Sequence, residues 1–302
     1  MVLQSLFPVF ALIALGVLLK HFNLTNDAFL KTSDKLIYFI FFPMMLFWKI
    51  GGAASTSAID LKFCAAAICA VLIVYVLSTA FINFKVTPFQ AGSFSQSCYR
   101  FNTYIGMAIV MTALGEEGAQ RFGVLIGFVI PIINVLAVST LIWFSSSRYT
   151  ARQRFRLTLK ALVSNPLILA CFAGIVFSQA KLSFPIFLNN TFQLTSLVTL
   201  PLALLSIGGI LTLKNLRGNF KLSLAASLFK LLILPVIGYI FLKLFGVTDL
   251  SFRVGMVYFA LPTSTALYVL SAQLNSDTEL ASAAIVLSTI LSFVSLTVAL
   301  LI

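Results

Sequence analysis

Two short polar stretches interrupt otherwise apolar sequence and hold side chains that could bind a ligand. The first runs from Gln96 to Gly106 and contains the cation Arg100, and the second is centred on Pro262. The candidate binding residues are Arg100, Asn102, Thr103, Gly106, Pro262, Thr263, Ser264 and Thr265. A guanidinium with amide and hydroxyl neighbours is suited to a carboxylate. The pattern therefore predicts a site for a small organic anion.

Arg100 lies about 12 residues into an apolar run that begins near Pro88, which is roughly 18 Å and close to the middle of a bilayer. Charged side chains at that depth are costly and are usually functional or paired. Two interpretations are open: Arg100 binds an anionic substrate, or it bonds carbonyl groups of a broken helix. Asn134 is a further candidate, either lining the same cavity or bonding a neighbouring helix. Lys230 is similarly deep, and we expect it to snorkel to the membrane surface.

The composition excludes a soluble protein. Of 302 residues, 60% are hydrophobic and 9% are charged, whereas soluble domains have about 45–50% apolar and about 25% charged residues. The net charge of +12 suggests nucleic-acid binding, but the basic residues stand singly at the ends of apolar runs, as in loops that flank membrane helices. We expect an all-α polytopic membrane protein, with the lipid bilayer and no nucleic acid as partner.

Ten apolar runs are long enough to cross a bilayer, because about 20 residues span its apolar core. With the N-terminus outside, twelve basic residues fall in cytoplasmic loops and six in outer loops. This bias favours a plasma-membrane protein (bacterial inner membrane) with both termini outside. The runs are 3–20, 32–51, 61–83, 88–114, 120–143, 161–180, 190–213, 222–243, 250–274 and 279–301.

A weak internal repeat divides the chain into halves. A shift of 158 residues places Pro8 on Pro166, and it also places Pro43 on Pro201. Each half would hold five spans, an odd number, so the second half would be inverted in the membrane. We expect a first repeat at 1–144, a basic cytoplasmic linker at 145–160 and an inverted second repeat at 161–302. The two matched prolines Pro43 and Pro201 are candidate hinges, although packing bends in a scaffold are the favoured explanation.

The two polar stretches fall at equivalent positions of the halves, in the fourth and ninth runs. Interrupted helices persist in lipid only where they line a cavity or pack within protein. Broken helices at equivalent positions of inverted halves meet near the midplane, which is the best pointer in a sequence to a transport site. We therefore expect helices 4 and 9 to be broken and to cross each other.

Several chemistries have no residues to support them. The eight acidic residues lie at expected loops or helix ends, and the four cysteines lie in apolar runs without metal-ligand spacing. The sequence has no GxxxxGK[ST] motif and no nucleophile–base pair. We therefore expect neither an enzyme nor an ATPase, and neither a resident metal nor a cofactor.

The polar stretches resemble the auxin efflux carrier family. RFNTYIG at 100–106 is similar to the Arg/Asn/Thr/Gly core of that family, and ALPTSTALYVLSAQLN at 260–275 is similar to its ninth helix. Asn102 matches an asparagine that follows the first crossing proline of the plant carriers, where this chain has Phe101. Leu267 stands where those carriers have a later proline. Bacterial members are often described as malonate or malate transporters, and plant members export auxin.

The resemblance implies a fold and an assembly. It implies ten helices in two inverted five-helix repeats, with a scaffold of helices 1, 2, 6 and 7 that often forms a homodimer. It implies a transport domain of helices 3–5 and 8–10, with helices 4 and 9 crossing at the site. The bile-acid:sodium symporters share this crossing architecture.

The resulting hypothesis is a secondary transporter of small carboxylates that works by alternating access at the helix 4/9 crossing. Because we expect no acidic residue inside the membrane, the sequence favours a uniporter. One alternative is sodium coupling through neutral oxygens, as in the bile-acid symporters. A further alternative is a membrane ligand sensor that does not transport, although the short loops leave no room for an output domain.

Overall fold

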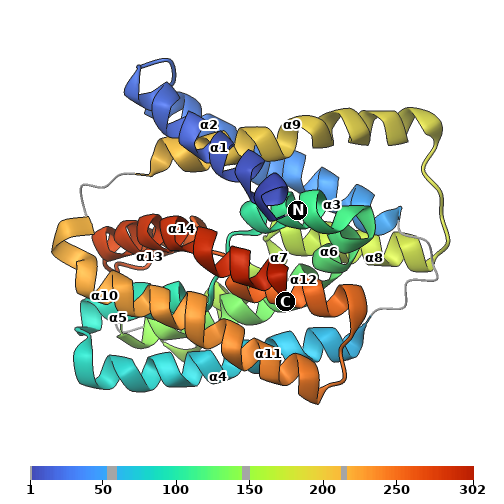
Figure 1. Cartoon of the computed structure of the whole chain (residues 1–302). Helices are drawn as coiled ribbons and strands as arrows, with labels where there is room; N and C mark the ends of the chain where they lie inside the picture. Colours follow the sequence, from blue (N-terminus) through green and yellow to red (C-terminus); the bar gives the residue numbers. More distant parts are fainter. Residues whose placement is uncertain (1, 53–59, 145–149, 212–215) are drawn as a thin grey trace. The chain divides into compact units, whose positions relative to one another are not determined.

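The computed structural model describes residues 2–52, 60–144, 150–211 and 216–302, and every regular element within these ranges is a helix (Figure 1). The predicted all-α fold is confirmed for this part of the chain. The elements are α1 (Val2–His21), α2 (Asp27–Leu36), the π-helical turn η1 (Ile37–Phe41), α3 (Phe42–Gly51), α4 (Leu61–Lys85), α5 (Pro88–Tyr99), α6 (Thr103–Phe144), α7 (Ala151–Val163), α8 (Pro166–Gln179), α9 (Ile186–Ile210), α10 (Leu216–Leu228), the π-helical turn η2 (Phe229–Ile233), α11 (Leu234–Leu244), α12 (Asp249–Ala260), α13 (Ala266–Gln273) and α14 (Thr278–Leu301).

Six stretches of the described chain are long and apolar enough to cross a membrane. A multi-pass membrane protein is thereby supported, whereas the count of ten spans stays a prediction. The six stretches are Val2–His21, Leu61–Lys85, Pro88–Phe144, Ile186–Ile210, Leu216–Leu244 and Thr278–Leu301. The difference has local causes, because the stretch from α2 to α3 carries charged residues such as Asp34, Lys35 and Lys49, α8 has only 14 residues, and α12 and α13 are short.

Two predicted features of the chain's middle look different in the structure. The fourth and fifth runs are joined in α6, which bends at Gly115, whose φ of 71° and ψ of −165° suit only glycine. The predicted linker at 145–160 is helical from Ala151 onward, because α7 begins there and extends beyond the linker. Residues 145–149 of that linker lie outside the described residues.

The described chain forms two compact units. Unit 1 comprises Met1–Asp60, Met107–Phe128 and Val163–Leu211, and unit 2 comprises Leu61–Gly106, Val129–Leu162 and Thr212–Ile302. Unit 1 therefore holds α1 to α3, α8, α9 and the middle of α6. Unit 2 holds α4, α5, most of α7, α10 to α14 and both ends of α6.

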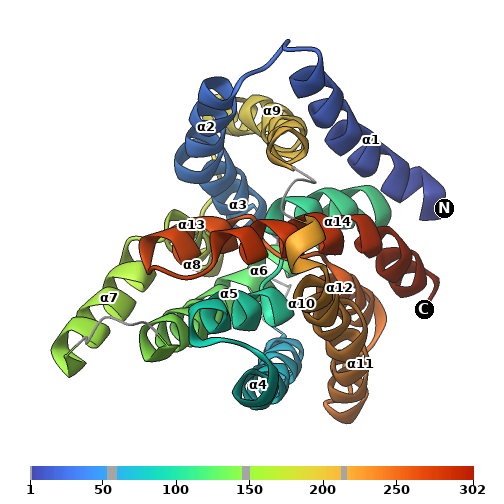
Figure 2. The ribbon, with the colours of Figure 1, turned by 90° about the vertical axis from the view of Figure 1, so that its left-hand side faces the viewer.

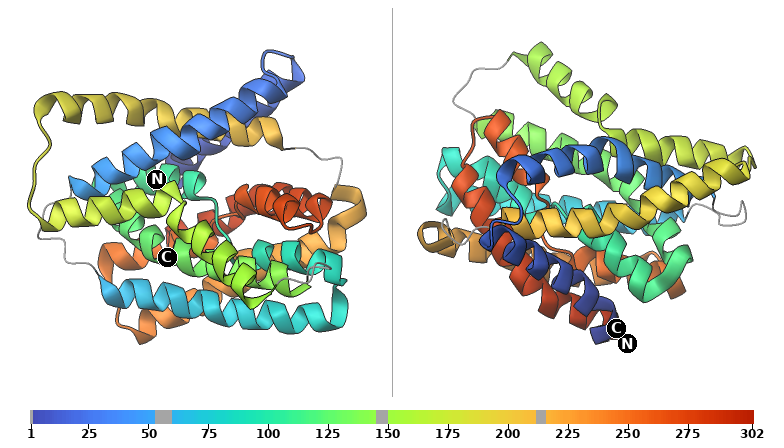
Figure 3. Two further views of the ribbon diagram at one scale, coloured as in Figure 1. Left: turned by 180° about the vertical axis from the view of Figure 1, so that it is seen from behind. Right: turned by 90° about the horizontal axis from the view of Figure 1, so that it is seen from above.

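Within unit 1, α1 packs against α9 through glycines that allow the two backbones to touch (Figure 3). A Cβ atom at Gly16 would overlap the carbonyl oxygen of Leu205, and one at Gly208 would overlap that of Ile13. Small residues at helix interfaces are typical of membrane proteins, where close packing rather than the hydrophobic effect drives association.

Within unit 2, α14 packs against several other helices. It contacts α10, α12, α5 and α13 (Figure 2), and its inner face is rich in small buried residues such as Ala281, Ala284 and Ser288. These small side chains let several helices approach it closely. The unit thereby holds the two halves of the ninth predicted run beside the first half of the fourth.

Similar local features recur at a nearly constant offset in the two halves. After α1, the N–H of Leu24 bonds the carbonyl of Leu19 and Asn23 has a φ of 56°; after α8, Leu182 bonds Phe177 and Lys181 has a φ of 54°. The offset is 158 residues (181 − 23). Helices α5 and α12 each have 12 residues and are offset by 161 (249 − 88). The offset thus grows by three residues between the two places.

Candidate functional site at the two helix interruptions

The two predicted interruptions are present and bonded to each other in unit 2. Helix α5 ends at Tyr99 and α6 begins at Thr103, while α12 ends at Ala260 and α13 begins at Ala266. The main-chain N–H of Asn102 donates to the carbonyl oxygen of Pro262 at 2.9 Å. Backbone groups left open by the two breaks therefore satisfy each other, as buried polar groups must.

Thr263 joins the two interruptions a second time. Its hydroxyl lies 3.3 Å from the carbonyl oxygens of both Ser97 and Arg100, and its main-chain N–H donates to the hydroxyl of Ser288 in α14. The side chain is fully buried. Thr263 thus supplies a donor to the open carbonyl end of α5.

Asn102 caps the second half of the broken helix and keeps one group free. Its Oδ1 accepts from the main-chain N–H groups of Tyr104 and Ile105, both at 3.1 Å. The side chain is 2% exposed, and its Nδ2 has no hydrogen-bond partner among the described residues. A buried donor without a partner is costly, so this amide is a natural donor to a ligand oxygen.

Arg100 is held by two side-chain amides. Its Nη1 donates to Oε1 of Gln96 and its Nη2 to Oδ1 of Asn134, both at 3.1 Å. Asn134 is 6% exposed and belongs to the part of α6 in unit 2. The structure therefore brings Asn134 to Arg100. Both amides are neutral, so these two bonds orient the guanidinium without cancelling its charge.

Lys230 closes the carbonyl end of α12. Its Nζ donates to the oxygen of Phe259 at 2.9 Å, and the hydroxyl of Ser295 donates to the oxygen of Ala260 at 2.8 Å. The last carbonyls of a helix lack intrahelical partners and favour a cation. Lys230 is fully buried, so the expectation that it snorkels to the membrane surface is wrong.

The remaining predicted residues take lesser places. Thr103 and Gly106 lie in the first turn of α6, where Gly106 donates to the Asn102 carbonyl at 3.0 Å. The hydroxyl of Ser264 accepts from the N–H of Ala266, the first residue of α13, and Thr265 is half-buried beside it. The hinge candidates Pro43 and Pro201 belong to unit 1, at the start of α3 and inside α9. Their hinge role stays a prediction.

Sequence reasoning missed two residues. The ring of Tyr258 packs edge-on against the ring of Phe101, with 4.8 Å between the ring centres. The buried hydroxyl of Tyr258 has no hydrogen-bond partner among the described residues. Lys49, which the sequence assigned to an outer loop, is instead buried in the last turn of α3 and paired with Glu116. The sequence offered no signal for this pair because its members are 67 residues apart.

The groups at the described site offer hydrogen bonds and positive charge. Across the described ranges, no group of three or more His, Cys, Asp or Glu side chains could hold a metal ion. The groups at the interruptions are a guanidinium, amides, hydroxyls and main-chain N–H groups. This set can bind an anion.

The known proteins to which this chain is similar are all described as transport proteins. The sequence model of a family described as "Membrane transport protein" matches residues 145–300. An uncharacterized transporter of Methanocaldococcus jannaschii is 24% identical over 292 residues, which cover 94% of this chain and 93% of that protein. A Rhizobium meliloti protein provisionally named for malonate transport is 25% identical over 198 residues, or 64% of this chain and 61% of that protein.

Proposed function

The chain belongs to the membrane transport protein family, which is the auxin efflux carrier family, and we propose that it carries small organic anions with carboxylate groups across the plasma membrane. Family membership makes it a transport protein and not an enzyme. The carboxylate substrate is a proposal, and the similarity to a protein named for malonate transport supports it.

The observation that carries the proposal is the bonded pair of helix interruptions in unit 2. At this point α6 and α13 begin, so the positive ends of their helix dipoles lie beside the two interruptions and favour an anion. The unpartnered Nδ2 of Asn102 is a second donor, and the Arg100 guanidinium adds positive charge. Such a set of neutral donors with one cation suits a carboxylate better than a cationic or apolar solute.

We propose that transport proceeds by alternating access at this crossing. Unit 1 holds α1 to α3, α8 and α9, which correspond to the scaffold helices 1, 2, 6 and 7 that the family resemblance implies, and it also holds Met107–Phe128 of α6, which belongs to the expected transport helices 4 and 5. The grouping of α1 to α3 with α8 and α9 supports the proposed scaffold. A homodimer formed through the scaffold, and an orientation with both termini outside, belong to the same proposal.

The proposed carrier is a uniporter driven by the substrate gradient and the membrane potential. The site residues described above include no carboxylate that could carry a coupled proton. Sodium coupling through neutral oxygens is the alternative, and the crossing offers hydroxyl and carbonyl oxygens for it. Replacing sodium with potassium separates the two, since loss of concentrative uptake in potassium would exclude the uniporter.

Flux in proteoliposomes tests the site. Labelled malonate is the probe, and Arg100→Ala and Asn102→Ala each should reduce its initial uptake rate at least tenfold, because each removes a donor to the carboxylate. Size-exclusion profiles matching the wild type would show that the variants fold. Thr297→Val, in which the lost hydroxyl bonds only Phe293 of its own helix, should transport at the wild-type rate. Wild-type rates from both site variants would refute the site.

A further inference from the structure

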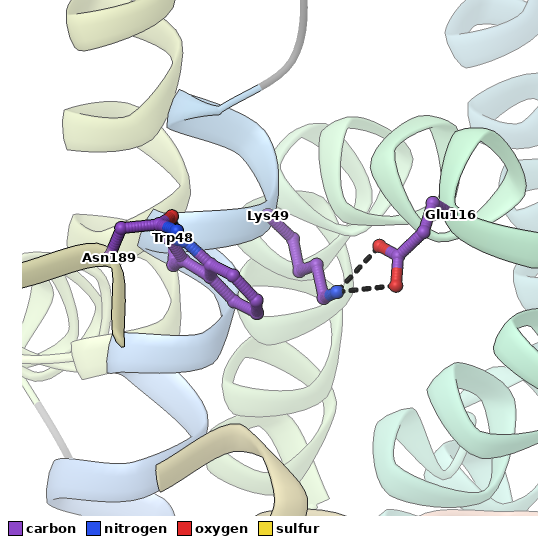
Figure 4. A network of polar contacts seen from close by, with 4 residues as sticks. All are labelled: Trp48, Lys49, Glu116 and Asn189. Carbon is purple, nitrogen blue, oxygen red and sulfur yellow. Dashed lines mark hydrogen bonds and ion pairs between the residues drawn. The ribbon is translucent and has the colours of Figure 1, made fainter. Parts of the chain in front are cut away.

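A second cation in the structure is buried where no substrate role has been assigned. Lys49, in the last turn of α3, is 7% exposed, and its Nζ lies 2.6 and 2.5 Å from the two oxygens of Glu116 (Figure 4). Removing an ammonium group from water is expensive unless an anion compensates it. The surroundings of Lys49 therefore require an anion, and a carboxylate with both oxygens on Nζ satisfies that requirement.

The wall of this cation site is fixed by groups other than Glu116. The ammonium lies over the Trp48 ring, 4.3 Å from its centre. Nε1 of Trp48 donates to Oδ1 of Asn189 in α9 at 2.8 Å, which fixes the plane of the ring. All of these residues belong to unit 1. The site that receives the carboxylate is thus preorganised, which reduces the cost of binding.

Glu116, by contrast, reaches the lysine from an exposed bend. It follows Gly115, the glycine with positive φ at which α6 changes direction. No atom of the described residues lies within 4 Å of the position where a Gly115 Cβ would be built, and the Glu116 side chain is 63% exposed. The Glu116 carboxylate is therefore open on its solvent side. A free organic carboxylate would present the same chemical group to Lys49.

We propose that Lys49 and Trp48 form a second carboxylate-binding site, built from different residues than the crossing, which the Glu116 carboxylate occupies in this structure. The ligand class is an organic carboxylate, and the proposal shares only that class with the proposed function. Glu116 acts as an attached competitor, and a short tether gives an effective concentration in the millimolar range. Dilute ligand then reaches Lys49 only when Glu116 leaves.

Thermal unfolding of the purified protein in detergent tests the site without measuring transport. Glu116→Gln removes the competitor and leaves Lys49 without its anion, so malonate should raise the Tm of this variant more than that of the wild type. The excess should be about 3 °C at a malonate concentration ten times Kd. Malonamide, which is neutral and similar in shape, should produce no excess at equal ionic strength.

Two variants show where the excess arises. Glu117→Gln is the matched control, because Glu117 is the adjacent acid and pairs with Arg121 on the surface; it should respond to malonate as the wild type does. Lys49→Gln combined with Glu116→Gln should abolish the excess. Malonate that binds at the crossing would raise the Tm of the wild type and of every variant by the same amount. If this common rise in Tm is absent, the result refutes the proposed function and not this site.

The outcome that overturns the proposal is an equal effect of malonate and malonamide on Glu116→Gln, or an excess that survives in the double variant. If Glu116→Gln does not fold, Glu116→Asp replaces it. Aspartate keeps the charge but is one methylene shorter, so it competes less well and should give a smaller excess that again requires Lys49. Absence of that excess would equally overturn the proposal.

Discussion

At the scale of single residues, Thr263 is the side chain whose loss should weaken the crossing most cleanly. Its buried hydroxyl is the donor for the Ser97 and Arg100 carbonyls. Thr263→Val keeps the shape and removes that donor, which should cost about 1–3 kcal/mol. The expected result is a Tm lower by several degrees, measured by thermal unfolding in detergent.

Two variants make the Thr263 result specific. Thr263→Ser keeps the hydroxyl and should recover most of the lost stability. Thr297→Val removes a hydroxyl that bonds only the Phe293 carbonyl of its own helix, so its Tm should stay within about one degree of the wild type. Equal losses from the two valine variants would contradict the bridging role of Thr263.

Residue types were predictable from the sequence, but their partners were not. The cluster from Gln96 to Gly106 is polar in an apolar context, which is a local signal. The pairing of Arg100 with Asn134 depends on how α5 meets a later part of α6, and no spacing rule predicts it. Lys49 shows the same limit, because a cation at a helix end has the same sequence pattern whether it is exposed or buried.

At the scale of elements, the contact of α1 with α9 depends on Gly208. A Cβ there would overlap the backbone carbonyl of Ile13, which cannot move without shifting the helix. Gly208→Ala should therefore lower the Tm by several degrees, although alanine is the better helix former. Gly218→Ala is the control, because within the described ranges no atom lies within 4 Å of its Cβ position in α10. It should leave the Tm unchanged or slightly higher, and a loss equal to that of Gly208→Ala would contradict this account.

The sequence predicts the repeat from matched prolines, and the similar features that the structure shows in the two halves are local. The same helix-terminating bonds follow α1 and α8 at the offset of 158 residues, because Leu24 and Leu182 each bond a carbonyl five residues back. At the interruptions the offset is 161, so an ungapped comparison placed Tyr104 opposite Pro262 instead of Phe101. A sequence shift cannot detect such a small insertion, since apolar residues match one another at any register.

At the scale of the whole molecule, the number of spans depends on what interrupts a helix. A π-helical turn, a bend at glycine or a break at a binding site each shortens the regular element without moving the chain out of the membrane. Two of the six long stretches run through such interruptions, since Pro88–Phe144 contains both the break and the bend, and Leu216–Leu244 contains a π-helical turn. The count falls from ten to six in the described chain because the fourth and fifth runs form one stretch, the sixth and ninth runs give only short helices, and the second run carries several charged residues.

The stretch from α2 through η1 to α3 decides between these counts. It is a continuous helical path of 25 residues (10 + 5 + 10), which is about 37 Å and long enough to cross the apolar core. We expect it to span the membrane, so Lys31 at its start and Lys62 after its end should lie on opposite sides. Both side chains are exposed, and Lys31→Cys and Lys62→Cys are therefore suitable probes in a background without the four native cysteines. A membrane-impermeant maleimide applied to whole cells should label Lys62→Cys, and it should label Lys31→Cys only after lysis. Labelling of both from the same side would remove this span and with it the five-helix half, because the inverted repeat requires an odd number of crossings in each half.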